Sequence, residues 1–306
     1  MPTSNSTNYT LNGTEAIESA LEILGAAQAG EPLEADDTAT ALRHYNLMLK
    51  ALQRKLNIWK RKTATINLVL AQYIYTIGQK AAGNAKTLSS GNLVDTGADF
   101  TNDDIQAGDT VKNITAGTST TVATVTSSTI LILNSDIFTL GTEAYEITSA
   151  DVSAPRPLKI LECNRKGTAG DEITINELTR NEYENLPNKT SPGAPISYHY
   201  DPTLNNGTFY IWNAPDASAV TDWTIELVYQ ATIEDMDSLA DSVDCPAENL
   251  EAIVINLAYR LSSVFGGLSA SERNTLRADA KDSLDDASGF EQENGSIFFV
   301  PELRNY

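Results

Sequence analysis

The clearest structural signal in the chain is the stretch DDTATALRHYNLMLKALQRKLNIWKR, residues 36–61. Its large apolar side chains recur at intervals of three and four residues, at Leu42, Tyr45, Leu49, Leu52, Leu56 and Trp59. Because an α-helix turns once every 3.6 residues, this spacing places them on one face. We therefore predict a helix from Asp36 or Asp37 to about Arg61 that packs on the core along this face.

The opposite face of the same predicted helix is basic. It carries four cationic side chains, Arg43, Lys50, Arg54 and Arg61. Three roles are open to such a face: a solvated surface, a contact with another subunit, or a contact with phosphate. The sequence has 41 acidic and 21 basic residues, a net charge of −20. Between the two contacts, this abundance of acid favours the subunit contact.

Further helical patterns stand near both ends of the chain. Residues 12–28 form a first pattern, in which Asn12 and Glu15 have the spacing of a capping pair. Pro246 opens a later helix that stops at two glycines, and Ser269 with Glu272 caps a last helix that ends near residue 289. The simplest packing joins the two terminal helix pairs in one bundle.

Between the helix pairs the apolar period changes from helical spacing to two, which is typical of strands. The strongest hairpin signal is Asn206-Gly207, which separates two aromatic segments and predicts a tight turn. Residues 83–150 differ in composition from the segments on either side, because they are rich in Thr, Gly and Asp. We interpret them as a small β-domain inserted into an antiparallel β-region.

The predicted fold class is therefore α+β: a helical bundle with a projecting antiparallel β-region and an inserted small β-domain. The expected divisions are an N-terminal helix pair at 1–62, the β-region at 63–82 and 151–234, the inserted module at 83–150, a C-terminal helix pair at 235–289 and a tail at 290–306.

A second charged segment precedes the third long helix. Residues 190–259 contain no Lys or Arg, and five acids gather near the end of this stretch, at Glu234, Asp235, Asp237, Asp241 and Asp244. These side chains are candidates for the lining of a channel, or for a contact with the basic helix of a neighbouring subunit.

Signatures of enzymatic chemistry are missing from the sequence. It contains no phosphate-binding GxxxxGK[ST] loop, no GxGxxG after a strand and no GxSxG elbow. The only histidines are His44 and His199, which excludes a multi-histidine metal site, and we expect the thiol of Cys245 to be inert. The acids Asp99, Asp103, Asp104 and Asp109 lack the Gly and Glu of a calcium loop and are interpreted as solvated turn residues. We expect no catalytic activity, no cofactor and no membrane span.

The last segment of the chain carries an isolated apolar strip, Ile297, Phe298, Phe299 and Val300. We expect this tail to dock on another protein or on an adjacent subunit.

Several local patterns combine into a resemblance. They are the helix pair with Trp59 at its exit, Gln72-Tyr73, Glu182-Tyr183, Gly193-Ala194-Pro195, Phe209 to Trp212 followed by Ala214-Pro215, and Leu257-Ala258. Together they resemble the head-to-tail adaptor proteins of tailed bacteriophages, also called connector or tail tubular protein A-like proteins. The resemblance covers nearly the whole chain except residues 83–150.

The resemblance implies a structural protein of the virion, assembled in the host cytoplasm and placed at the portal–tail junction. Such adaptors form a ring, usually of twelve copies, with the portal protein above and a tail or nozzle protein below. The ring extends the channel for DNA, which passes without specific binding. In this picture Ile297 to Val300 dock on the portal or a neighbouring subunit. An alternative is a virion binding module whose β-insertion attaches tail fibres, another tail component or a glycan.

Overall fold

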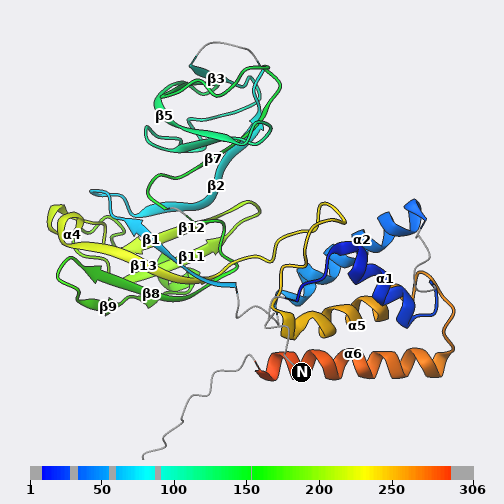
Figure 1. The fold of residues 1–306 in the computed structure, drawn as a ribbon. Coiled ribbons are helices and arrows are strands. Elements are labelled where there is room, and N and C mark those ends of the chain that lie inside the picture. The colour runs from blue at the N-terminus through cyan, green and yellow to red at the C-terminus, as the bar shows by residue number, and fades with distance from the viewer. Residues whose placement is uncertain (1–8, 28–33, 55–59, 87–90, 153, 291–306) are drawn as a thin grey trace, which may run out of the picture. The chain divides into compact units, whose positions relative to one another are not determined.

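The computed structural model describes residues 9–27, 34–54, 60–86, 91–152 and 154–290. These residues form six α-helices and thirteen strands, and the strands lie in one nine-stranded and one four-stranded sheet (Figure 1). The chain divides into two compact units, residues 1–59 with 233–306 and residues 60–232. The fold is mostly β, so the predicted α+β class, a helical bundle with a small β insert, is wrong.

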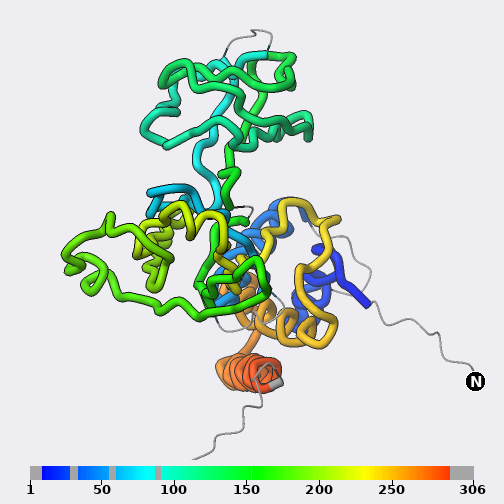
Figure 2. The backbone as a smooth tube through the Cα atoms, turned by 90° about the vertical axis from the view of Figure 1, so that its left-hand side faces the viewer, coloured from blue at the N-terminus to red at the C-terminus, as the bar shows by residue number. Residues whose placement is uncertain are grey.

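The helical unit contains α1 (Gly13–Ile23), α2 (Ala35–Leu52), α5 (Leu250–Leu261) and α6 (Ala270–Phe290). Figure 2 shows the blue N-terminal helices and the orange C-terminal helices packed in this one unit. Its core is formed by buried side chains from all four helices, among them Ile17, Leu21, Tyr45, Leu49, Ile253, Leu257, Leu261 and Leu276. Burial of this shared apolar surface, at about 25 cal/mol per Å², is what joins the two ends of the chain.

Two predicted helix starts are confirmed in atomic detail. The Asn12 side chain accepts a hydrogen bond from the Glu15 N–H, and the Glu15 carboxylate accepts one from the Asn12 N–H, each at 2.9 Å. Ser269 and Glu272 form the same reciprocal pair at the start of α6. Both boxes satisfy N–H groups that the first helical turn leaves without partners.

The predicted end of the second helix is wrong. The helix α2 ends at Leu52, and Arg61 is the first residue of strand β1 (Arg61–Asn67), where it pairs with Gln230. Strand pairing has overridden the helical pattern of the sequence there. The predicted core residues Leu56 and Trp59 lie outside the described residues.

The four-stranded sheet has the order β1, β13 (Trp223–Gln230), β8 (Lys159–Gly167) and β9 (Glu172–Thr174), all antiparallel. The nine-stranded sheet has the order β10 (Asn176–Glu177), β11 (Ser197–Pro202), β12 (Asn206–Trp212), β2 (Ile74–Asn84), β7 (Ala144–Thr148), β4 (Thr110–Asn113), β5 (Thr118–Ser127), β6 (Ile130–Leu133) and β3 (Asn92–Val94). The short helices α3 (Arg180–Glu184) and α4 (Ala217–Asp222) lie in the connections.

The predicted hairpin exists, but its turn is displaced. Pro202 pairs with Gly207, so residues 203–205 form the loop and Asn206-Gly207 belong to β12. Gly207 is needed there for space, because a Cβ atom at this position would collide with the Tyr200 ring. The sequence signal was thus correct about the hairpin and wrong about why the glycine is there.

Strand β2 connects two apolar cores within the β-rich unit. Residues 74–78 pair with β12, whereas residues 79–84 pair with β7. The first half packs in a core that includes Ile66 and Phe209, and the second half belongs to a core that includes Phe100 and Tyr145. The predicted boundary between the β-region and the inserted module, at residues 82 and 83, falls inside β2. The Thr-rich segment therefore continues the sheet of the β-region through this shared strand (Figure 1).

Candidate functional site

The predicted basic residues are only partly brought together. Arg43 and Lys50 lie on α2, Arg54 follows the end of that helix, and Arg61 lies on β1 in the other unit. Arg43 and Arg54 are exposed and form no ion pair or hydrogen bond with any described residue. Their positive charge is therefore not used inside the described part of the chain.

Lys50 has intrachain partners. Its Nζ lies 2.7 Å from Oδ1 of Asp235 and donates a hydrogen bond of 2.9 Å to the carbonyl oxygen of Ile233. Nearby, Asn46 donates to the Met236 carbonyl at 2.9 Å and accepts from the Met236 N–H at 3.0 Å. Helix α2 thus holds the beginning of the acid-rich segment within one chain.

The five predicted acids lie in one loop, and two of their carboxylates, those of Asp241 and Asp244, accept hydrogen bonds within it. Asp244 accepts the Glu234 N–H at 2.9 Å, and Asp241 accepts the N–H groups of Asp237 and Ser238 at 3.1 and 2.7 Å. Glu234, Asp235, Asp237 and Asp241 are exposed, and Asp244 is half-buried. Local hydrogen bonding is therefore the role that the structure shows for two of these five side chains, and four of the five lie on the surface.

An exposed leucine lies among the basic residues of α2, and the sequence interpretation missed it. Leu47 is 57% exposed and follows Arg43 by four residues, one helical turn later. Around it is a shallow hollow of about 460 Å³, lined by Ala39, Leu42, Arg43, Asn46, Leu47 and Lys50. We call Arg43, Leu47, Lys50 and Arg54 the α2 face. The signal was present, since Leu47, Met48 and Leu49 cannot all point inward from one helix.

A groove between α5 and α6 was also missed. It has a volume of about 580 Å³ and is lined by Glu248, Asn249, Glu251, Ala252, Ile255, Asp279, Asp282, Ser283, Asp286 and Ala287. Three of its acids, Asp279, Asp282 and Asp286, are spaced three and four residues apart, which places them on one side of α6. This α5–α6 groove therefore combines five carboxylates with an apolar floor.

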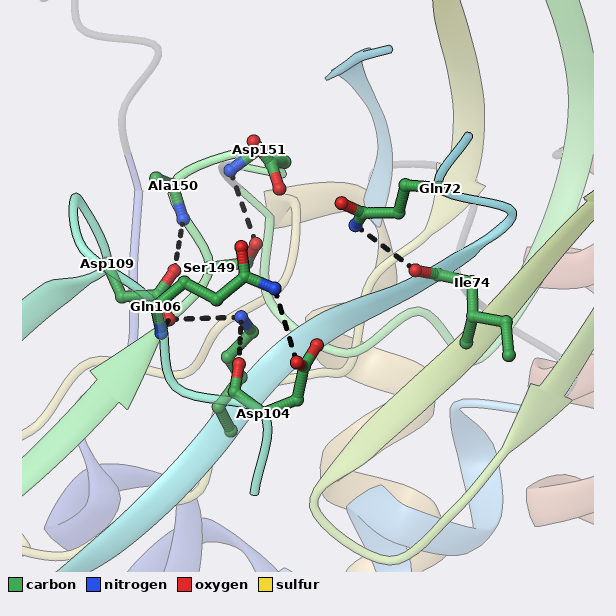
Figure 3. Close-up of polar contacts among 9 residues, drawn as sticks. Gln72, Ile74, Asp104, Gln106, Asp109, Ser149, Ala150 and Asp151 are labelled. Atoms are coloured by element: carbon green, nitrogen blue, oxygen red, sulfur yellow. Dashed lines mark hydrogen bonds and ion pairs between the residues drawn. The ribbon is translucent and has the colours of Figure 1, made fainter. Parts of the chain in front are cut away.

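A buried ion pair lies where β2 enters the Thr-rich part of the sheet (Figure 3). The Lys80 ammonium lies 3.0 Å from the Asp109 carboxylate and also donates to the Asp104 carbonyl at 2.8 Å. Asp109 further accepts the N–H groups of Gln106 at 2.8 Å and Ala150 at 3.0 Å. The two charged side chains are only 4% and 3% exposed. They tie β2, the turn before β4 and the segment after β7 together.

The surroundings of this pair alter a neighbouring carboxyl group. Burial raises the pKa of Asp151 above its usual range, and the nearby charge of Lys80 partly opposes that effect. The prediction that Asp109 is a solvated turn residue is wrong, because its carboxylate is buried and fully engaged.

No family model matches the chain, and no curated protein is significantly similar to it. The two surfaces of the helical unit and the ion pair must therefore be interpreted from their own chemistry.

Among the described residues, no group of three or more His, Cys, Asp or Glu side chains is arranged to hold a metal ion, and no helix is both long and apolar enough to span a membrane. Burial, with the charges of Asp244 and Glu248, raises the pKa of the Cys245 thiol to about 12. A thiol so rarely ionised at neutral pH is a poor nucleophile. The predicted docking strip Ile297, Phe298, Phe299 and Val300 lies outside the described residues.

Proposed function

We propose that the protein is a structural component of a tailed-phage virion that forms the ring-shaped adaptor between portal and tail and extends the DNA channel. The observation that carries the proposal is the α2 face. It places Leu47, 57% exposed, between two exposed arginines that have no partner among the described residues, and an apolar side chain flanked by arginines suits a protein–protein contact. The resemblance to the head-to-tail adaptors implies that the chain assembles as a ring of copies, and a contact between neighbouring copies is what such a ring requires.

In this proposal the protein has no enzymatic activity and no cofactor. Its partners are further copies of itself, about twelve in the ring by the resemblance, the portal protein above, and a tail or nozzle protein below, with tail fibres as a further candidate. The net charge of −20 suits a channel through which DNA passes without specific binding, since an acidic protein repels the phosphate backbone.

Assembly with the cognate portal protein tests this proposal. We expect the purified chain, mixed with portal, to form a symmetric ring that native mass spectrometry counts at about twelve copies and that negative-stain images place on the portal. A parallel mixture with an unrelated phage's portal serves as the control. A chain that stays monomeric at all concentrations and ignores the cognate portal would exclude an adaptor.

One observation favours the second candidate, a virion binding module. A cleft of about 570 Å³ lies beside the bend of β2, and hydroxyl, amide and charged groups line it, among them Gln79, Thr110, Glu146, Thr148, Ser149, Arg156 and Asn205. Such groups suit a polar ligand such as a glycan. If the module binds glycans, Arg156→Ala should abolish retention on a glycan array, while Lys159→Ala, at an exposed position on β8, should not. Equal retention of both variants and the unaltered chain would remove the cleft from consideration.

A further inference from the structure

The two unusual surfaces of the helical unit are complementary in charge. The α5–α6 groove carries Glu248, Glu251, Asp279, Asp282 and Asp286, and none of these five forms an ion pair with a described residue. The α2 face carries Arg43 and Arg54, which likewise form no ion pair with a described residue. Carboxylates gathered along one groove repel one another, so a cationic surface that enters it relieves this repulsion.

The two surfaces also match in spacing and in apolar character. Arg43 and Lys50 are seven residues apart on α2, as Asp279 and Asp286 are on α6, which is about 10.5 Å along a helix in both cases. Lys50 donates to Asp235 and to Ile233, which leaves one of its three N–H groups for another acceptor. Leu47 projects from the α2 face, and Ala252, Ile255 and Ala287 line the groove. An apolar contact can therefore form between the flanking charges.

The two surfaces lie on different sides of the helical unit. Helices α1 and α2 pack on one side of α5, and α6 packs on the other (Figures 1 and 2). The α2 face points away from α5, since Tyr45, Met48 and Leu49 fill the inner side of α2. One copy cannot bring its own α2 face into its own groove, but it can offer the face to one neighbour and the groove to another.

We propose that the α2 face of one copy docks in the α5–α6 groove of the next copy, with Arg43, Lys50 and Arg54 against the groove acids and Leu47 against Ile255. This contact is heterologous, so repeating it generates a closed ring when the rotation between copies closes. The inference rests on the proposed ring and names the two surfaces that build it. Its partner is a second copy of this chain.

Charge reversal on either side tests the contact. Arg43→Glu/Arg54→Glu makes the face acidic, and Asp279→Lys/Asp286→Lys makes the groove basic. Each double variant should weaken self-association at least tenfold by analytical ultracentrifugation, because like charges then meet. The matched control is Arg273→Glu/Arg277→Glu, at exposed positions of α6 outside the groove, which should assemble as the unaltered chain does. Far-UV circular dichroism checks that all variants keep their helices.

Mixing the two defective variants is the decisive measurement. The acidic face of the arginine variant can then dock in the basic groove of the aspartate variant. The basic face of the aspartate variant can likewise dock in the acidic groove of the arginine variant. The mixture should form oligomers in which the variants alternate, and native mass spectrometry should find equal numbers of each. If the unaltered chain forms rings and the reversed variants form them equally well, this contact is wrong and the proposed function stands. If the unaltered chain forms no oligomer even with portal, the proposed function and the contact both fail.

Discussion

Replacing Lys80 by methionine is expected to destabilise the β-rich unit by about 3–5 kcal/mol, since this change removes one partner of a buried ion pair and leaves the other charge behind. The Asp109 carboxylate is 3% exposed, so water cannot take over from the lost ammonium. It would keep two N–H donors, from Gln106 and Ala150, which satisfy part of its hydrogen-bonding capacity but not its charge. The loss should therefore approach the full cost of leaving a buried charge without its partner.

Urea denaturation followed by tryptophan fluorescence measures this loss, because Trp212 and Trp223 both lie in the β-rich unit. Lys112→Met is the matched control. It removes the same charge from β4, but at an exposed position, so it should change the free energy of unfolding by less than about 0.5 kcal/mol. Equal transition midpoints for the two variants would show that the Lys80–Asp109 pair contributes nothing to the stability of this junction.

The burial of Lys80 was not predictable from periodicity. In the stretch Ile74–Asn84 the alternation of buried and exposed residues is interrupted by a register shift between Gln79 and Ala81. A bulge changes which side of the sheet the following side chains face. The lysine then turns toward Asp109, which belongs to a turn about thirty residues later. Only tertiary structure brings these two charges together.

The helical unit was easier to predict than the β-rich unit because its signals are local. Caps such as Asn12 with Glu15 depend on residues three apart, and the apolar spacing of α2 predicts its buried face directly. Strand partners lie far apart in sequence, as Arg61 and Gln230 do. The Thr-rich strands between residues 83 and 150 were predicted as a separate small β-domain, and the sequence did not show that they extend the sheet of the β-region. The α+β class was wrong because it made the helical bundle the main part of a mostly β fold.

The candidate surfaces were also predicted only where their residues are close together in the sequence. Sequence spacing placed Arg43, Lys50 and Arg54 on one face, but it offered the acids near Asp241 as a channel lining or as the counterpart of this face, and it overlooked the groove. Three of the groove acids lie on α6, but Glu248 and Glu251 come from the start of α5 and the turn before it. A groove built by two helices is visible in a sequence only after their packing is known.

Replacing Gly78 by alanine is the second change with a large expected effect. Gly78 lies where β2 leaves β12 for β7, and its φ of +97° is a conformation that residues with a side chain rarely adopt. That conformation alone should cost about 1–3 kcal/mol. A Cβ atom would also lie 2.9 Å from the backbone nitrogen of Arg156 and 3.2 Å from its Cα, and backbone atoms yield less readily than the end of a side chain.

Gly170→Ala separates these two costs. Gly170 has a φ of +94°, nearly that of Gly78, but an added Cβ meets no atom within 4 Å. Its replacement should show the conformational cost alone, so Gly78→Ala should lower the free energy of unfolding of the β-rich unit by a clearly larger amount in the same urea experiment. The difference between the two variants measures the close approach of Arg156 to β2. Equal losses would mean that the segment around Arg156 moves aside freely, and that the bend of β2 depends on the conformation of Gly78 alone.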